Sequence, residues 1–259
     1  FLMSKRRCDL VKIGPFVAWI SLYVSMPAIG YEQLDLDRLL ETKVCQGCNL
    51  VGADLQNADL RNADLRKTRL NHVNLENANL TGANLDGTQL FKANLRNSDL
   101  SNSTLRDAIL HDSDLSDANL TNAKLPRADL TLANLSRTDL TGVILGGAKL
   151  SRANLSGAIL LEASIEQVQF DWALLDGANF TRAFLVHSNF WRASLVGSIL
   201  KEADLTLTIL ANTDSRNADF TSANLTGTNL INTDLRGATL DKVIRCNTET
   251  TELIDNSNC

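Results

Sequence analysis

The stretch QNADLRNADLRKTRL, residues 56–70, repeats one five-residue phrase: a small residue, a polar residue, leucine and two further polar residues. Every fifth position from Leu50 to Leu240 gives 39 residues, of which 33 are Leu. The residue two places earlier is always small, with Ala at 23 of the 39 places. A period of five fits neither the 3.6 residues of a helical turn nor the alternation of a strand, so the sequence predicts an all-β solenoid. The exceptions to leucine are Ile165, Phe170, Phe180, Phe190, Ser215 and Phe220.

The alternation of buried and polar positions predicts the cross-section of this solenoid. If the leucine and the small residue face inward, each pentapeptide makes one short side and one turn, and four of them close a square. The small second residue relieves crowding inside. Backbone hydrogen bonds between coils at the ~4.8 Å spacing of strands would make about ten coils a rod roughly 45–50 Å long.

The phrases ADLRNADL, ANLTGANL and ANLTGTNL resemble those of the pentapeptide repeat proteins. The resemblance covers residues 45–244 and implies a right-handed quadrilateral β-helix. Functions within the family include the binding of DNA gyrase by mimicry of DNA, but fold alone does not indicate function.

The segments outside the repeats indicate caps and export. Residues 31–44 predict a short helical cap, with Leu36, Leu39, Leu40 and Lys43 on adjacent positions over the first coil. Residues 1–30 combine a basic start, a 14-residue apolar run and small residues before Gly30. This pattern predicts a secretory signal peptide cleaved after Gly30, too short for an ordinary membrane span. An uncleaved anchor or a buried amphipathic start is the alternative.

Removal of the first thirty residues would leave two cysteines at each end of the repeats. Cys45 and Cys48 both fall on inward positions, where structural cysteines are favoured. A disulfide between Cys45 and Cys48 is sterically uncertain. The tail CNTETTELIDNSNC, within a predicted cap of residues 245–259, resembles the ending of exported pentapeptide repeat proteins. That resemblance implies a Cys246–Cys259 disulfide, which persists only outside the reducing cytosol.

Charge argues against a nucleic-acid partner. Residues 31–259 carry 21 basic and 29 acidic side chains, a net of −8, whereas nucleic-acid binding needs a basic stripe. Mimicry of DNA needs an acidic ladder. The residues at twenty-residue intervals from Asp59 alternate Asp with Asn up to Asp139, and then read Ile159, Asn179, Ile199 and Asp219. We expect Asn side chains to bridge neighbouring Asp, which indicates stability more than phosphate imitation.

The sequence does not predict an enzyme, a metal site or a cofactor. Its histidines, His72, His111 and His187, are expected at the surface with no Ser or Cys nucleophile beside them. We expect the neighbours His111 and Asp112 to point different ways around a turn. Calcium-binding glycine-aspartate repeats are missing.

Bulky residues break the repeat between residues 161 and 210. Phe170 and Phe190 should stack inside the coil, as core filling. Outside, two tryptophans with flanking arginines are typical of an interface hot spot, although stacking that only shields the wall is the alternative. The candidate partner surface is Trp172, Trp191, Arg152, Arg192 and Leu174.

These observations predict a non-enzymatic, exported β-helical rod that binds an unknown protein partner or acts as a scaffold. The expected location is the periplasm or the thylakoid lumen, without stable membrane insertion. A monomer is expected, with a dimer as the alternative. The rival interpretation is a DNA mimic that binds gyrase or another topoisomerase.

Overall fold

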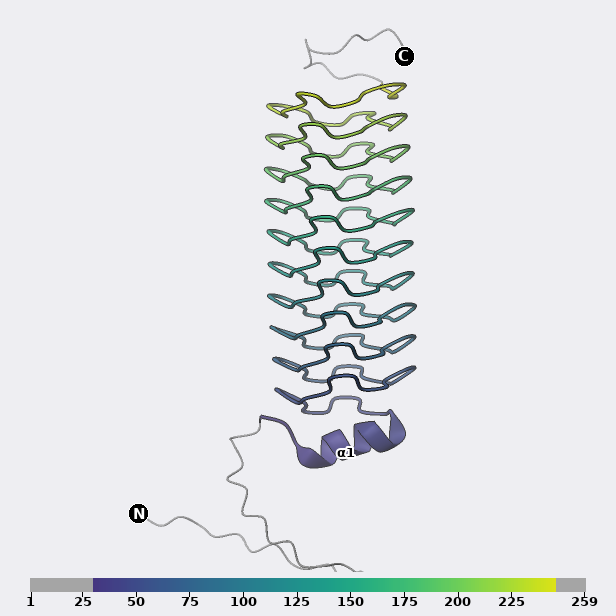
Figure 1. Ribbon diagram of the computed structural model, residues 1–259, viewed down its shortest axis with the longest axis vertical. Coiled ribbons are helices and arrows are strands. Elements are labelled where there is room, and N and C mark those ends of the chain that lie inside the picture. The colour runs from purple at the N-terminus through teal and green to yellow at the C-terminus, as the bar shows by residue number, and fades with distance from the viewer. Residues whose placement is uncertain (1–29, 246–259) are drawn as a thin grey trace, which may run out of the picture.

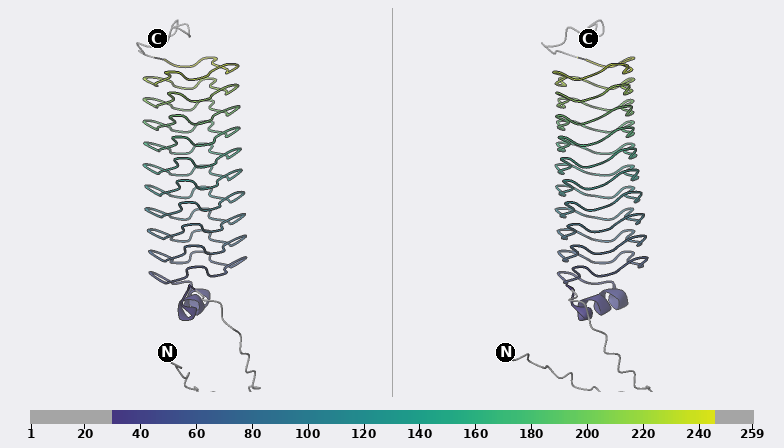
Figure 2. Two further views of the ribbon diagram at one scale, coloured as in Figure 1. Left: turned by 90° about the vertical axis from the view of Figure 1, so that its left-hand side faces the viewer. Right: turned by 60° about the vertical axis from the view of Figure 1, so that its left-hand side comes forward.

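The computed structural model describes residues 30–245, which form one short helix followed by a straight stack of coils (Figure 1). Isolated parallel bridges join each residue that precedes an inward position to the residue twenty places later, from Val44↔Asp64 to Asn224↔Ile244. A coil therefore takes twenty residues and four pentapeptides, and residues 45–244 make ten coils. The axis of the stack stays straight from the first coil to the last in all views (Figures 1 and 2).

Each pentapeptide satisfies its backbone through the same set of hydrogen bonds. Leu55 N–H donates to Asn74 O at 2.7 Å and Asn57 N–H donates to Glu76 O at 2.9 Å, both in the next coil. The residue before each inward residue donates back to the preceding coil. Within the turn, Ala58 N–H donates to Leu55 O at 3.1 Å. Hydrogen bonds between stacked coils thus take the place of those between the strands of a conventional sheet. The stability of each coil therefore depends on its neighbours.

The turn requires a left-handed backbone at the second residue after each inward residue. Asn57 has a φ of 58°, and positive φ recurs at the 40 equivalent positions from Gly47 to Lys242. Glycine occupies 11 of these positions and Val, Ile or Thr none. A side chain branched at Cβ is strongly disfavoured at positive φ, so the turn explains this composition.

The predicted inward residues form a continuous core along the rod. Leucines such as Leu125 and the small residues before them are buried. Phe170 and Phe190 stack with centroids 4.7 Å apart, as predicted, and Phe180 meets Phe170 edge to face at 6.4 Å. Where Ser or Thr takes the small position, its hydroxyl bonds a nearby carbonyl, as Ser98 Oγ does to Leu95 O at 2.6 Å. These bonds let polar groups occupy a dry interior.

Ser215 is the one hydroxyl among the described leucine-type positions, and it is fully buried. Its Oγ lies 3.2 Å from Thr213 Oγ1, which in turn bonds Leu210 O at 2.8 Å. The side chain of Ser215 thus meets a neighbouring side-chain hydroxyl.

Helix α1, Gln33–Thr42, lies across the amino-terminal end of the stack (Figure 1). Leu39 is buried against the first coil and Leu36 packs partly against it. Leu40 is 55% exposed, so its place in the predicted apolar stripe is wrong. Lys43 ends the helix with a φ of 59° and donates its N–H to Leu39 O at 2.8 Å. The helix therefore buries a narrower stripe than its leucine spacing indicated.

The carboxyl end of the stack is more open than its middle. Leu230, Leu235 and Leu240 are only partly buried, because no further coil follows them in the described chain. The predicted signal segment up to residue 29 lies outside the described residues. So do Cys246, Cys259 and the predicted tail cap beyond residue 245.

Candidate functional site

Two tryptophans lie exposed at one corner of the coils. We call the set Trp172, Trp191, Arg192, Arg152 and Leu174 the tryptophan patch. Trp172 is 42% and Trp191 36% exposed, and their rings meet edge to face with centroids 5.6 Å apart. The backbone brings the two residues together, because Trp172 N–H donates to Trp191 O at 3.0 Å across the coil boundary.

Arg192 joins the two indoles into one unit. Its Cζ lies 4.7 Å from the centroid of the Trp172 ring and 4.5 Å from that of Trp191. Both distances lie within the range of cation–π contacts. The sequence prediction that these three side chains come together is therefore confirmed.

Arg152 and Leu174 lie near this unit but contribute differently. Arg152 occupies the turn position one coil before Trp172, and its N–H donates to Asp171 O at 2.9 Å. The described contacts of the two indoles include no cation–π contact from Arg152. Leu174 lies two residues after Trp172 on the adjoining side and is 48% exposed. The stacked unit is thus smaller than the predicted surface, with Arg152 and Leu174 at its margin.

The same corner carries a second aromatic cluster that the sequence analysis missed. Phe91 meets His72 edge to face at 5.5 Å and lies 5.8 Å from His111. Lys92 Nζ is 5.1 Å from the centroid of the Phe91 ring. Phe91, Trp172 and Trp191 are the Phe or Trp residues at turn positions of the described coils, and all three belong to this corner. A list of the residues whose numbers differ by multiples of twenty would have shown that these side chains lie at the same corner of the rod.

The histidines do not form a catalytic arrangement with the nucleophiles described here. The expectation that His111 and Asp112 point apart is wrong, because His111 Nδ1 lies 3.5 Å from Asp112 Oδ2. Both side chains are about one-third exposed, and no hydroxyl or thiol bonds His111 Nδ1 among residues 30–245. The pair is a surface contact beside Phe91.

One potential metal-binding group occurs in the described chain, under helix α1. Carboxylate and sulfur atoms of Asp35, Cys45 and Cys48 lie within 4.8 Å of one another. Cys45 and Cys48 are joined by a disulfide, with Cα atoms 5.3 Å apart. Arg38 Nη2 also lies 2.6 Å from Cys48 Sγ. Sulfurs bonded to each other, with a guanidinium beside them, do not offer the thiolates that a metal such as zinc needs.

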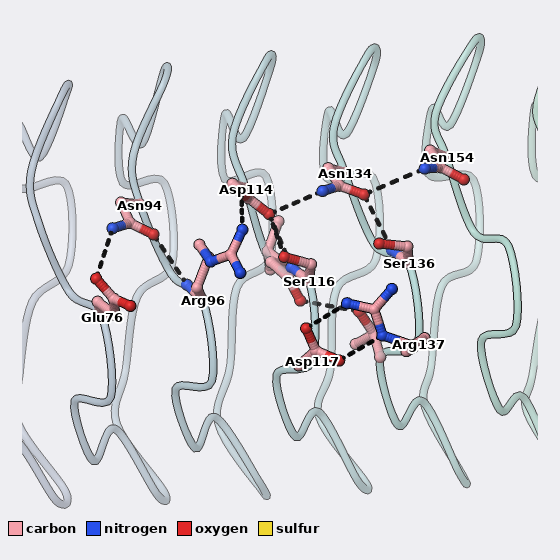
Figure 3. A network of polar contacts seen from close by, with 12 residues as sticks. Glu76, Asn94, Arg96, Asp114, Ser116, Asp117, Asn134, Ser136, Arg137 and Asn154 are labelled. Atoms are coloured by element: carbon pink, nitrogen blue, oxygen red, sulfur yellow. Dashed lines mark hydrogen bonds and ion pairs between the residues drawn. The ribbon is translucent and has the colours of Figure 1, made fainter.

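Many acidic side chains of the described coils form hydrogen bonds or ion pairs with side chains of neighbouring coils. Asn119 Nδ2 donates to Asp99 Oδ1 at 3.2 Å, so the predicted bridging of Asp by Asn is confirmed there. Another column continues the pattern, with Asn134 Nδ2 donating to Asp114 Oδ1 at 3.0 Å (Figure 3). Figure 3 also shows Arg137 forking onto Asp117 of the preceding coil. The Arg137 guanidinium lowers the pKa of Asp117, so this ion pair persists until the pH falls well into the acid range.

The repeats match the family model described as pentapeptide repeats, with eight copies in overlapping segments that together span residues 44–237. The chain belongs to the pentapeptide repeat family. Members of this family fold as right-handed quadrilateral β-helices, in agreement with the four-sided coils described above. They are generally non-enzymatic structural or binding proteins.

Two solved structures are similar to this pentapeptide repeat protein. A trypsin-treated variant of QnrB1, a plasmid-mediated fluoroquinolone resistance protein, is 19% identical with a TM-score of 0.59, covering 77% of this chain and 90% of that chain. HetL, involved in heterocyst differentiation regulation in the cyanobacterium Nostoc sp. strain PCC 7120, is 33% identical with a TM-score of 0.31, covering 78% of this chain and 86% of that chain. No curated protein matches the chain. Among residues 30–245, no helix has the length and apolar character needed to cross a bilayer.

Proposed function

We propose that the protein is a non-enzymatic rod that binds a partner protein through the tryptophan patch and acts as a scaffold outside the cytosol. The observation that carries this proposal is the exposed Trp172–Trp191 pair held by Arg192. Tryptophan and arginine are enriched among the residues that dominate binding energy at protein interfaces. No cofactor takes part in this function.

The fold makes the patch a rigid platform. Trp172 and Trp191 stand on turns of adjacent coils whose backbones are hydrogen-bonded to each other, so binding would order little additional chain. Two exposed apolar side chains lie nearby in the coils: Leu174 is two residues after Trp172, and Ile209, 39% exposed, pairs with Asn189, two residues before Trp191. A partner that covers these side chains would gain hydrophobic free energy without a large entropic penalty.

Export is the second part of the proposal. The basic and apolar pattern of residues 1–30 supports it, and the Cys45–Cys48 disulfide is consistent with an oxidising compartment, either the periplasm or the thylakoid lumen. Amino-terminal sequencing of the native protein should find Tyr31 first, and fractionation should recover it outside the cytosol. A cytosolic protein that retains residues 1–30 would contradict export.

A DNA mimic directed at gyrase or another topoisomerase is the alternative function. The column from Asp59 lacks a continuous run of carboxylates, and nine described arginines form ion pairs with acidic side chains. Such a surface does not reproduce the regular phosphate charge of DNA. Inhibition of gyrase supercoiling by the purified rod would favour the alternative.

Crosslinking tests partner binding at the patch. A photoreactive side chain introduced at Ile209 should crosslink a specific protein in cells that express the chain at native level. Trp172→Ala/Trp191→Ala should abolish the crosslink. Phe184→Ala is the matched control, since Phe184 is 53% exposed in another column of the rod. Equal crosslinking in the double variant and the control would show that the indoles do not bind the partner.

A further inference from the structure

The arginines of the tryptophan patch differ from most arginines of the rod. Nine of the described arginines form ion pairs with Asp or Glu. Among residues 30–245, neither Arg152 nor Arg192 has a carboxylate within ion-pair distance. Asp171, the residue before Trp172, accepts a hydrogen bond from Ser151 Oγ at 2.6 Å. Neither arginine of the proposed binding surface therefore has an ion-pair partner among the described residues.

Among residues 30–245, the Arg192 guanidinium makes no hydrogen bond and no ion pair. Its Cζ lies 4.7 and 4.5 Å from the centroids of the two indole rings, whose planes are nearly perpendicular, so at most one ring lies flat against the guanidinium. The N–H donors lie in the guanidinium plane and point outward from its edge, in a fork that matches a carboxylate. Desolvation by the adjacent indoles would strengthen a hydrogen bond made there.

The spacing of the two arginines indicates the form of an acidic ligand. Arg152 and Arg192 occupy the same turn position two coils apart, which corresponds to roughly 10 Å along the rod at ~4.8 Å per coil. In an extended peptide of the polyproline II type, residues three apart lie on the same face and are separated by about 9 Å. Trp172 stands between the two arginines, so the part of the segment between the two acidic residues would pass over an indole.

We propose that the partner binds through an extended acidic segment that lies along the rod axis and places carboxylates on Arg152 and Arg192. This inference rests on the proposed function and specifies the chemistry of its partner. The two arginines provide charge complementarity for the carboxylates, and the tryptophans provide the desolvated surface between them.

Tryptophan fluorescence gives a direct test. The chain has three tryptophans, so the full-length Trp19→Phe variant retains only Trp172 and Trp191. The probe is a synthetic Ser/Gly-rich peptide with Glu at every third position and one Leu between two of them. The control peptide has Gln in place of each Glu. We expect the Glu peptide to change the tryptophan emission in a saturable, salt-sensitive manner, and the Gln peptide to bind at least about tenfold more weakly.

Charge reversal identifies the residues responsible. Arg152→Glu/Arg192→Glu in the same background should weaken binding of the Glu peptide by about tenfold or more. Arg106→Glu is the matched control, because Arg106 also lacks an ion-pair partner among the described residues but lies at another corner. Circular dichroism and thermal melting should show that all variants remain folded. Equal binding of the two peptides, no binding of the Glu peptide, or equal effects of the two reversals would overturn the inference.

The crosslinking assay separates this inference from the proposed function. Loss of the partner crosslink in Trp172→Ala/Trp191→Ala, with retention in Arg152→Glu/Arg192→Glu, would support partner binding and reject an acidic segment. Loss in both double variants, with retention in Arg106→Glu, would support both. Retention in both would reject the tryptophan patch itself.

Discussion

At the residue scale, each pentapeptide position has one physical requirement. The leucine position must fill the core, the residue two places earlier must be small, and the second residue of the turn must accept positive φ. Asp or Asn before the leucine often accepts the N–H two residues later, as Asp59 Oδ1 does from Arg61 N at 3.2 Å. The motif is therefore the sum of a packing rule, a steric rule and a hydrogen-bonding rule.

Leu125 tests the packing rule. Leu125→Asp should disrupt the coils around it, because a buried carboxylate without a partner is expensive. We expect a lower melting temperature and a loss of several kcal/mol in the free energy of unfolding. The control Lys124→Asp changes the adjacent exposed residue and should melt near the wild type. Unchanged melting of Leu125→Asp would contradict the inward assignment of every fifth residue.

Asn77 tests the steric rule. This exposed residue has a φ of 56°, and Asn77→Val should destabilise the rod by about 1–3 kcal/mol because a β-branched side chain opposes that conformation. Asn77→Gly should be close to neutral. Chemical denaturation of the two variants measures the difference, and equal stability would show that the turn tolerates branching.

At the element scale, the coils were more predictable than the helix or the turns. The five-residue period alone indicated the square coil and its inward residues, because burial repeats without an insertion. The leucine spacing of α1 did not reveal that Leu40 faces away, since the orientation of a short helix depends on its docking to the first coil. The left-handed turn residue was missed, although the lack of Val, Ile and Thr at 40 positions was a readable signal. The stacking of Arg192 depends on side-chain torsions, which residue spacing does not specify.

The capping role of α1 gives the prediction at this scale. Leu39→Ala should loosen the helix and expose the first coil, because Leu39 is fully buried there. Exposed coil edges can pair between molecules, so light scattering should detect more self-association. Leu40→Ala removes an exposed side chain of the same helix and serves as the control. A monomeric Leu39→Ala variant with wild-type hydrogen exchange in the first coil would contradict the capping role.

At the scale of the whole molecule, stability is expected to be local. Each coil contacts only its neighbours, so events at one end should leave the middle of the rod folded. A disulfide in the tail would therefore stabilise only the last coil, where Leu230, Leu235 and Leu240 are partly exposed. Such a disulfide would persist only in an oxidising compartment.

The tail cysteines give the prediction at this scale. We expect Cys246 and Cys259 to be oxidised in the native protein, and Cys246→Ser/Cys259→Ser to increase self-association while the rod stays folded. Thiol labelling and light scattering measure the two effects. Freely labelled thiols at both positions in a monomeric native protein would argue against the disulfide and against an oxidising compartment.

Because every coil has twenty residues, the number of residues between two positions determines the angle between them around the rod axis. Removing twenty residues from the middle would shorten the rod by one coil and leave every column continuous. Removing five would turn all later residues by a quarter revolution relative to the earlier ones, while the core would still receive a leucine at each inward position. Deletion of residues 131–135 would thus move the tryptophans to a different side from Phe91 with little change in packing. The chain can vary the angle between two surface features in steps of 90°, and the distance between them in steps of one coil.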